Sequence, residues 1–404
     1  MLFALRLFAY RLVKPFQWPT SRVVPIPRPT TFVGSDAALR LCDSIAQFGL
    51  RRVLIVTDAV LVKLGIVEPL RQALAAKGVD VAIHDGITPD PTYEVLQRGF
   101  EAARAHRADS ILAVGGGSVI DAAKVIDAML VSGKSPAKLV GMLKVGKPML
   151  PLFAVPTTAG TGSEVTVAAV VTDPVRHVKS VVVDPKLVPA AAALDPLLTR
   201  GMPKHITAAT GMDALTHAVE SYINRWPHAE TAFHSVSAVR MIFANLPRAC
   251  ANGEDLEARE AMLLASFYAG LAFTKAYVGY VHAFSHKVGG MYGVPHGLGN
   301  AILLPYVLDF IKDAPLAEQR LAELAIAIGA GREGEPRAAL AQRFVARVHE
   351  LNRTVGIPEK LAALKASDIP EVARAAMIEA HRDYPVPKNM SLVDAEGLLR
   401  KCLA

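Results

Sequence analysis

Residues 110–124 read SILAVGGGSVIDAAK, a short apolar run followed by three glycines and a segment with helical character. The apolar run predicts a buried strand, and the glycines allow a sharp turn into a helix whose first N–H groups have no partner within the helix. Such a turn can hold a pyrophosphate group. The alternative is purely local, because Ser118 and Asp121 have the spacing of a capping box, which would explain both residues without a ligand.

Apolar runs alternate with helical segments on both sides of this stretch. Strands are expected at residues 52–57, 79–84, 110–114, 152–155, 167–172 and 179–183. This alternation predicts an α/β fold with a mainly parallel sheet. Beyond about residue 202 only helical periodicity is found, at residues 208–223, 232–243, 257–273, 316–328, 338–352 and 370–380. We therefore expect an N-terminal extension (1–28), an α/β domain (29–204) and an all-helical domain (205–404).

Polar residues follow two other predicted strands. Thr157, Thr158, Thr161 and Ser163 come directly after the run LFAV, at the carboxyl edge where parallel sheets bind ligands; an ordinary polar turn is the alternative. Asp58 follows the run RVLIVT. Its carboxylate can accept hydrogen bonds from ribose hydroxyls and would repel a 2′-phosphate, although an N-cap for the next helix explains it equally well.

Seven of the twelve histidines lie between residues 205 and 296. Asp213 and His217 are four residues apart, as are His282 and His286, so each pair shares one helix face. His296 follows in a Pro-Gly turn. A single pair of this kind is more often a hydrogen bond on a helix surface, but the combination predicts a metal site. One carboxylate with imidazoles and no thiolate favours Fe²⁺ or Zn²⁺ over Ca²⁺ or Mg²⁺.

The net charge of +7 is unevenly distributed. Five basic residues precede the first acid, Asp36, and removing those five from +7 leaves +2 for the rest of the chain. A body so close to neutral gives no electrostatic reason to bind nucleic acid. The three cysteines are far apart and form no C-x-x-C pair, which predicts a reduced, intracellular protein without a thiolate metal site.

Residues 1–22 interleave leucines and aromatic residues with arginine and lysine. This pattern breaks the apolar core that a signal peptide requires, so a cytoplasmic location is expected. The segment is interpreted as an extension that packs on the body or is disordered. The alternative is an interfacial helix that makes peripheral membrane contact.

Four runs together resemble the iron-containing (group III) alcohol dehydrogenase family. They are GGGSVIDAAK (115–124), PTTAGTGSEVT (156–166), AATGMDALTHAVESY (208–222) and GYVHAFSHKVGGMYGVPHGLGNAILLP (279–305). The similarity covers about residues 29–398. It implies an N-terminal dinucleotide-binding domain, a C-terminal helical metal-binding domain and an active site in the cleft between them.

The resemblance also implies roles for individual residues. Metal ligation falls to Asp213, His217, His282 and His296, and a proton relay to His286. The cofactor implied is NAD, which Asp58 favours over NADP. The other implied cofactor-binding residues are Gly116, Gly117, Ser118, Thr157, Thr158, Thr161, Ser163 and Lys179. One departure is Asp90, where many relatives have an asparagine that contacts the cofactor, because an ionised carboxylate cannot donate a hydrogen bond.

These features predict an NAD-dependent alcohol dehydrogenase or aldehyde reductase. A divalent metal would lower the pKa of the alcohol hydroxyl while hydride passes to nicotinamide C4. The alternatives are a glycerol dehydrogenase, a maleylacetate reductase or a dehydroquinate-synthase-like lyase of the same fold, and more remotely a non-catalytic structural or membrane-recruited module. The expected partners are a small alcohol or aldehyde and, by family analogy, a second copy in a homodimer.

Overall fold

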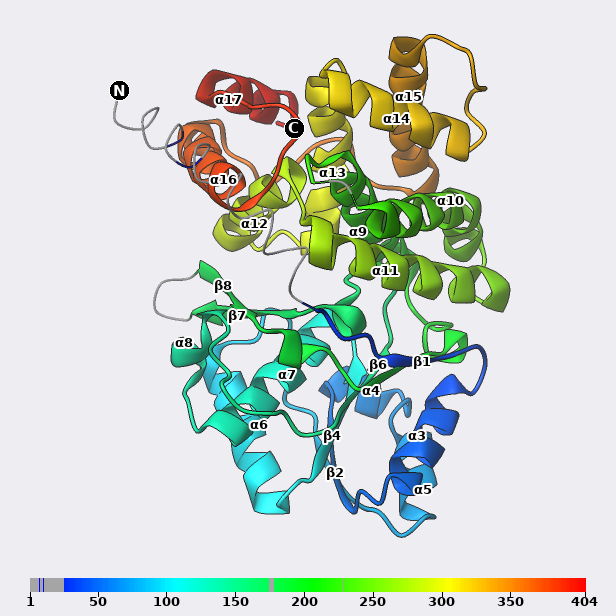
Figure 1. Cartoon of the computed structure of the whole chain (residues 1–404), viewed down its shortest axis with the longest axis vertical. Helices are drawn as coiled ribbons and strands as arrows, with labels where there is room; N and C mark the ends of the chain where they lie inside the picture. Colours follow the sequence, from blue (N-terminus) through cyan, green and yellow to red (C-terminus); the bar gives the residue numbers. More distant parts are fainter. Residues whose placement is uncertain (1–6, 8–9, 11–24, 174–177, 227) are drawn as a thin grey trace. The chain divides into compact units, whose positions relative to one another are not determined.

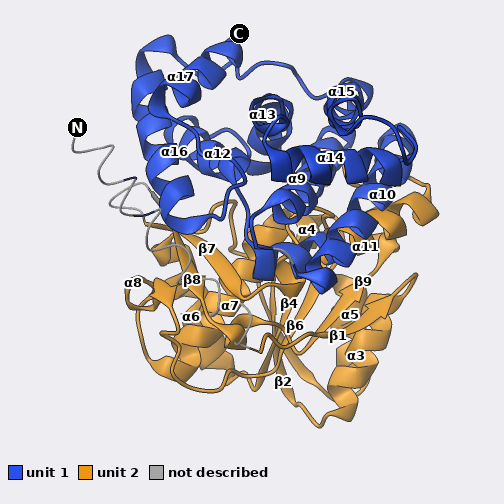
Figure 2. Ribbon diagram, turned by 45° about the horizontal axis from the view of Figure 1, so that its top comes forward, with its two compact units in different colours: residues 1–24, 203–253, 268–404 blue, residues 25–202, 254–267 orange. Residues whose placement is uncertain are grey.

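The computed structural model describes residues 7, 10, 25–173, 178–226 and 228–404. Residues 1–22, for which membrane contact is an alternative, lie outside the described residues except for Leu7 and Tyr10. The chain forms two compact units (Figure 2). Unit 1 comprises residues 1–24, 203–253 and 268–404, and unit 2 comprises residues 25–202 and 254–267.

Unit 2 contains a six-stranded sheet in the order β1-β9-β6-β4-β2-β3, in which every neighbouring pair is parallel. The strands are β1 (Thr30–Val33), β2 (Arg52–Val56), β3 (Asp80–His84), β4 (Ser110–Gly115), β6 (Leu152–Pro156) and β9 (Ala191–Leu194). A second sheet has the order β5-β8-β7, with β7 and β8 antiparallel. Its strands are β5 (Gly141–Met142), β7 (Ala168–Asp173) and β8 (Val178–Val183). The predicted α/β fold with a mainly parallel sheet is confirmed.

Helices cover both faces of the six-stranded sheet (Figure 1). The helices of this region are α3 (Ala37–Gln47), α4 (Ala59–Lys63), α5 (Glu68–Ala75), α6 (Tyr93–His106), α7 (Gly117–Ser132) and α8 (Pro136–Leu139), with the short 3-10 helices η2 (Ser163–Val165), η3 (Pro185–Leu187) and η4 (Pro196–Leu198). Alternate residues of each strand enter opposite cores: Val53 and Ile55 of β2 pack with α3 and α5, whereas Leu54 and Val56 pack with α6 and α7. The strands are apolar throughout because both faces are buried.

Three strands of the described chain were not predicted from the sequence. They are β1, β5 and β9. The run of β9 is AAAL, and alanine has a low preference for strands, so the sequence carried no strand signal there. Burial of the whole of β9 between β1 and β6 stabilises the strand despite its composition.

Unit 1 is helical. Its helices are α9 (Lys204–Ile223), α10 (Ala229–Ala251), the last part of α11 (Leu256–Ala276), α12 (Tyr280–Tyr292), α13 (His296–Ile311), α14 (Pro315–Ala327), α15 (Arg337–Val355), α16 (Ile369–Asp383) and α17 (Leu392–Lys401), with the 3-10 helix η5 (Ala366–Asp368). Helix α9 is buried over most of its length and packs against α10, α13, α14 and α15. The predicted helical character of the C-terminal half is confirmed.

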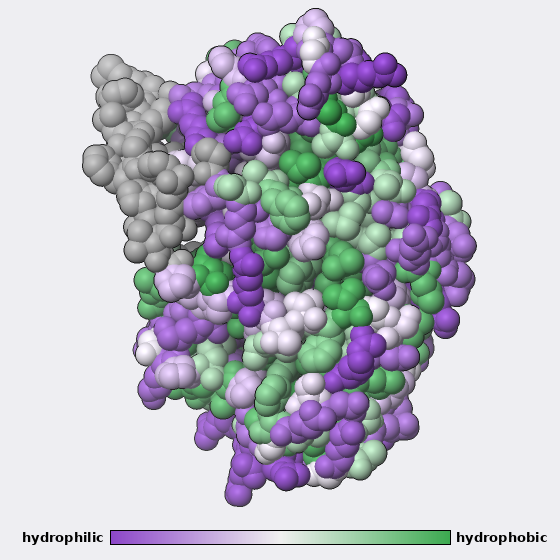
Figure 3. Space-filling view, turned by 45° about the vertical axis from the view of Figure 1, so that its right-hand side comes forward, coloured by the Kyte–Doolittle hydropathy of each residue, from purple (hydrophilic) through white to green (hydrophobic). Residues whose placement is uncertain are grey.

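Hydrophilic and hydrophobic side chains are interspersed on the face drawn in Figure 3. Within the described ranges, no single helix is long and apolar enough to cross a membrane. Helices α11 and α12, which meet at a bend of 102°, reach that length and hydropathy only as a pair.

Candidate functional site

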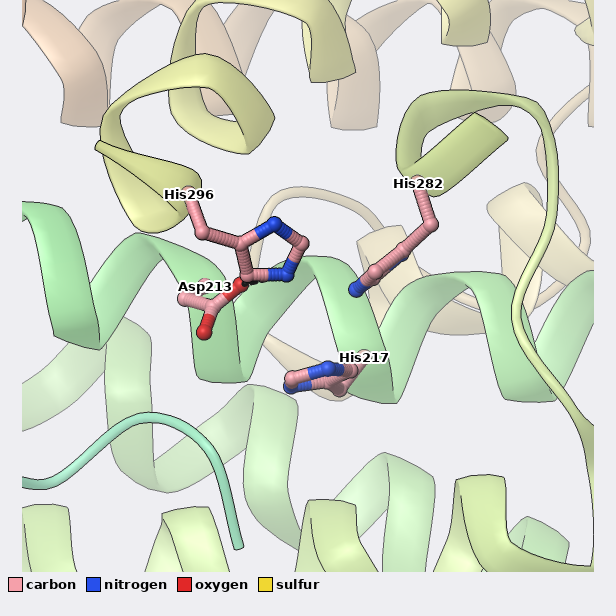
Figure 4. A group of neighbouring side chains, drawn as sticks. All are labelled: Asp213, His217, His282 and His296. Carbon is pink, nitrogen blue, oxygen red and sulfur yellow. Dashed lines mark ion pairs between the residues drawn. The ribbon is translucent and has the colours of Figure 1, made fainter. Parts of the chain in front are cut away.

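Four predicted metal-ligating side chains of unit 1 converge on one point (Figure 4). Asp213 and His217 lie one turn apart on α9, His282 is on α12, and His296 is the first residue of α13 rather than part of a turn. One donor atom from each of the four lies within 4.8 Å of the others. The first three residues are buried, and the His296 side chain is 28% exposed. One carboxylate and three imidazoles in this arrangement fit a divalent transition ion.

Close backbone approaches set the spacing of the helices that carry these ligands. A Cβ atom added to Gly297 would lie 2.6 Å from the carbonyl oxygen of Ala209, so α13 packs directly on the backbone of α9. A Cβ atom on Gly299 would lie 2.7 Å from Oγ of Ser285, and that hydroxyl donates a hydrogen bond to the backbone oxygen of His296. Only glycine fits at 297 and 299 without displacing these neighbours.

Glu220 fixes the orientation of His282. Its fully buried carboxylate accepts hydrogen bonds from Nδ1 of His282 (2.6 Å) and from the backbone N–H groups of Gly279 (2.8 Å) and Val281 (2.7 Å). With the proton on Nδ1, the Nε2 lone pair of His282 is directed to the cluster. Burial raises the pKa of Glu220, and hydrogen bonds from backbone N–H groups oppose that rise because they favour the ionised form.

The imidazole of His282 is held neutral, as a metal ligand requires. Burial lowers its pKa well below the usual value, and the neighbouring His217, His296 and His286 act in the same direction. The rings of His217 and His282 are stacked with centroids 4.6 Å apart, and Phe273 stacks on His217 at 4.2 Å. These contacts hold the ligand rings in fixed planes.

Asn300, which is fully buried on α13, contacts the same cluster. Its Nδ2 is 2.6 Å from Oδ1 of Asp213, 3.1 Å from Nε2 of His282 and 3.2 Å from Nε2 of His296. One side-chain amide therefore contacts three of the four candidate ligands.

His286 is part of a separate hydrogen-bond network beside the cluster. Its Nδ1 lies 2.6 Å from Oε1 of Glu379 on α16, and the same oxygen accepts a hydrogen bond from the hydroxyl of Tyr384. Burial acts to raise the pKa of Glu379, but His286, Lys287 and Tyr384 outweigh it and lower the pKa to about 2. The His286 ring also stacks on that of His296, with centroids 5.3 Å apart.

The predicted cofactor-binding loops of unit 2 lie at adjacent strand ends. Strands β6, β4 and β2 are parallel neighbours, so the threonine-rich loop after β6, the glycine loop after β4 and Asp58 after β2 share the carboxyl edge. A Cβ atom on Gly117 would lie 2.6 to 2.9 Å from side-chain atoms of Thr161, and one on Gly116 would lie 3.3 Å from Oγ1 of Thr158. The bare glycine backbone and the threonine hydroxyls thus form one cradle that fits a pyrophosphate.

The capping-box explanation of the glycine loop is wrong. Helix α7 is capped by Gly116 and has no side-chain cap, so its first N–H groups are not occupied by Ser118. Asp121 instead accepts hydrogen bonds from the backbone of Val170 and from the side chain of Ser163. The side chain of Ser163 is therefore hydrogen-bonded to Asp121.

A buried lysine also connects α7 to the segment that follows the threonine-rich loop. Nζ of Lys124 donates hydrogen bonds to the backbone oxygens of Thr166 (2.9 Å) and Ala168 (2.8 Å) and lies 3.0 Å from Oγ1 of Thr166. Burial lowers the pKa of Lys124 to about 8. Together with Asp121, this lysine fixes the two loops relative to each other.

Asp58 and Lys179 each have a partner within unit 2. Oδ1 of Asp58 accepts hydrogen bonds from the backbone N–H groups of Val60 and Leu61, so the N-cap explanation holds for this oxygen. Lys179 of β8 forms an ion pair of 2.7 Å with Asp90, the residue that departs from the family pattern. The carboxylate at position 90 is therefore balanced by a cation from this chain.

Comparison with known proteins agrees with the arrangement of both halves. Residues 28–196 match a family model described as iron-containing alcohol dehydrogenase, and residues 207–403 match the C-terminal model of the Fe-containing alcohol dehydrogenase family. The NAD-dependent methanol dehydrogenase of Bacillus methanolicus is 38% identical over 350 residues, which is 86% of this chain and 91% of that protein. The chain belongs to the iron-containing alcohol dehydrogenase family.

Other members of the family are equally similar over nearly the full length. Lactaldehyde reductase of Escherichia coli (strain K12) is 37% identical over 355 residues, covering 86% of this chain and 91% of that protein. A solved structure of 1,3-propanediol oxidoreductase has a TM-score of 0.90 and 35% identity, covering 94% of this chain and 100% of that one. The family and these relatives are alcohol and aldehyde oxidoreductases of the EC 1.1.1 type, which confirms the predicted reaction class.

Three residues of this iron-containing alcohol dehydrogenase site were missed from the sequence. Glu220 follows Asp213 and His217 at helical spacing, and Asn300 lies four residues after His296, so both share a helix face with a ligand. That spacing is a signal that could have found them. Glu379 is 93 residues from His286, and no local pattern connects the two.

Proposed function

We propose that this protein is an NAD-dependent alcohol dehydrogenase and aldehyde reductase whose divalent cation, Fe²⁺ or Zn²⁺, is held by Asp213, His217, His282 and His296. The observation that carries the proposal is the convergence of four donor atoms within 4.8 Å. When bound, the cation supplies a Lewis acid for the substrate oxygen and NAD accepts hydride at nicotinamide C4.

Side chains around the ligands prepare the site and move the proton. Glu220 keeps the proton of His282 on Nδ1, so that Nε2 serves as the ligand atom. His286 donates from Nδ1 to Glu379, which leaves Nε2 able to accept a proton from the alcohol hydroxyl and pass it to solvent. His286 is the candidate catalytic residue.

NAD binding is assigned to the carboxyl edge of the six-stranded sheet. The backbone of Gly116, Gly117 and Ser118 at the start of α7 receives the pyrophosphate. The hydroxyl residues of the adjoining loop that complete the cradle are Thr157, Thr158 and Thr161. Ser163, which was also expected to bind the cofactor, supports the loop through its hydrogen bond to Asp121. Oδ2 of Asp58 accepts from the ribose and disfavours the 2′-phosphate of NADP, and Lys179 is directed to a ribose hydroxyl.

Metal analysis of a ligand variant tests this function. His282→Ala is expected to lose bound metal and NADH-dependent aldehyde reduction together, because a buried ligand is removed. His205→Ala is the matched control, since it alters an exposed histidine on α9, the helix that carries Asp213 and His217. A His282→Ala variant that is metal-free and fully active would refute the assignment. Metal content after anaerobic purification distinguishes Fe²⁺ from Zn²⁺.

The substrate proposed is a small aliphatic alcohol or its aldehyde. Relatives of this chain are named for methanol, lactaldehyde and 1,3-propanediol, all of which are short molecules. A panel of alcohols and aldehydes of increasing chain length, with NAD and NADP, measures kcat/KM for each. A preference for long-chain substrates would contradict this proposal without affecting the reaction class.

A homodimer in the cytoplasm is proposed for the assembled protein. The support for the dimer is family analogy, and light scattering of the purified chain tests it.

Peripheral membrane contact through residues 1–22 is the alternative to a purely cytoplasmic location, and it is favoured by the mixture of apolar and basic residues in that segment. Deleting residues 2–22 and comparing vesicle pelleting decides between the two, because equal pelleting contradicts membrane contact.

A further inference from the structure

Asn300 makes contacts that packing alone does not explain. The side chain is fully buried on α13, and its Nδ2 faces Oδ1 of Asp213 and the Nε2 atoms of His282 and His296. Nε2 of His282 is an acceptor, because its Nδ1 donates to Glu220. The amide nitrogen is thus surrounded by groups that accept hydrogen bonds or bind cations.

The number of N–H groups limits what this amide can do. A side-chain amide has two N–H groups. The contact of 2.6 Å to Asp213 is the shortest of the three and is charge-assisted, while the contacts of 3.1 and 3.2 Å to the two imidazoles compete for the second N–H. The firm hydrogen bond is therefore the one that sets the rotation of the Asp213 carboxylate.

The other end of the amide is unfavourable for stability. Oδ1 of Asn300 is buried and makes no hydrogen bond within the described part of the chain. A buried carbonyl oxygen without a partner costs roughly 1–3 kcal/mol, and leucine, of similar shape, would avoid that cost. An amide kept here at the expense of stability indicates a role for its N–H groups.

We propose that Asn300 is a positioning residue that orients Asp213 toward the cation and thereby sets how tightly the site holds a divalent metal. This inference rests on the proposed function, since it presupposes that Asp213, His282 and His296 are ligands. A carboxylate held by a neighbouring donor presents a fixed geometry to a metal, whereas one without the donor can rotate.

The chain offers a matched control in Asn352 of α15. It is also a buried asparagine, its Nδ2 donates to the backbone oxygen of Ala301 on α13 at 2.7 Å, and its Oδ1 has no partner among the described residues. This hydrogen bond is made to the backbone and not to a candidate ligand. Asn300 and Asn352 thus differ mainly in whether the amide faces the metal site.

The test is titration of the metal-stripped full-length protein with Co²⁺, whose visible absorption reports coordination geometry. Wild type, Asn300→Leu, Asn300→Ala and Asn352→Leu are compared for dissociation constant, by chelator competition, and for the shape and intensity of the Co²⁺ absorption bands. Both Asn300 variants are expected to bind Co²⁺ about 10- to 100-fold more weakly with an altered spectrum. Asn352→Leu is expected to keep the wild-type affinity and spectrum.

Each outcome is decisive. Unchanged affinity and spectrum in Asn300→Leu would overturn the proposal, as would weakened binding in Asn300→Ala alone, because that result indicates a packing defect. If Asn352→Leu weakened binding as much as Asn300→Leu, the effect would be structural and the proposal would also fail. Failure of the wild type to bind Co²⁺ would instead refute the proposed metal site itself. Circular dichroism of each metal-free variant verifies folding before titration.

Discussion

Replacing Glu220 by glutamine should weaken metal binding about 10- to 100-fold although Glu220 is not itself a proposed ligand. The reason lies in the three N–H groups that its carboxylate accepts. Oε2 accepts hydrogen bonds from Nδ1 of His282 and from the backbone N–H of Gly279. Oε1 accepts one from the backbone N–H of Val281. Glutamine keeps only one oxygen.

Glutamine can be placed in two ways. If its oxygen takes the position of Oε2, the N–H groups of His282 and Gly279 stay satisfied, and the new amide nitrogen faces the buried N–H of Val281. One buried donor without a partner costs about 1–3 kcal/mol. The reverse placement leaves two donors unsatisfied. That cost lowers the stability of the metal-free and the metal-bound protein alike. The metal affinity falls because the hydrogen bond from Nδ1 of His282 is no longer charge-assisted, and a tenfold loss of affinity corresponds to only about 1.4 kcal/mol.

Zinc affinity measured by chelator competition tests this prediction, with the thermal midpoint of the metal-free protein recorded in parallel. Glu323→Gln is the control, since Glu323 on α14 accepts a hydrogen bond from Tyr222 and touches none of the ligands. The reasoning is refuted if Glu220→Gln binds zinc as tightly as wild type.

Three further predictions concern the cofactor, the proton relay and the stability of unit 2. Asp58→Ser removes the charge near the ribose but keeps an N-cap for α4, so the ratio of kcat/KM for NADP to that for NAD should rise at least about tenfold. His286→Asn should retain its metal and lose about 10²- to 10⁴-fold in kcat, measured with metal content on the same sample. Asp127→Asn should remove the contribution of this carboxyl group to the pH dependence of stability. Burial raises the pKa of Asp127 to about 7 from 3.8. The folded state therefore binds an extra proton between these values, and wild type should lose stability as pH rises from about 4 to 7, by on the order of 4 kcal/mol. Urea unfolding of both proteins at about pH 4 and about pH 8 measures this change in the free energy of unfolding.

Each of these three has a result that contradicts it. Asp85→Ser removes a nearby exposed charge. If it raised the ratio of kcat/KM for NADP to that for NAD as much as Asp58→Ser does, Asp58 would act only through net charge. An active His286→Asn enzyme would exclude the relay, and loss of its metal would show a structural role. A parallel pH dependence in wild type and Asp127→Asn would place the titrating group elsewhere.

Elements with strong periodicity were predictable from the sequence, and those that depend on distant neighbours were not. The β-branched run of β2 and the buried run of β4 were identified because their composition suits a strand. The AAAL run of β9 forms a strand only because β1 and β6 flank it. Helix α13 was missed because its residues are apolar almost all round and show no amphipathic period.

The candidate site shows the same division. Asp213 with His217, and His282 with His286, were recognisable because four-residue spacing places two side chains on one helix face. The capping-box explanation failed because a spacing cannot show that Asp121 turns toward Val170, 49 residues away. Asn300 and Glu379 act through residues that are distant in sequence, so their contacts could be found only in three dimensions.

The packing of α13 on α9 at Gly297 constrains how this enzyme can diverge. The neighbour of Gly297 is the carbonyl oxygen of Ala209, a backbone atom that no substitution at position 209 can remove. Any side chain added at position 297 would therefore force apart the helices that carry Asp213 and His296, and no change at position 209 could make room for it. Over evolutionary time, new substrate preferences are expected to accumulate away from this contact, while the metal geometry is inherited unchanged.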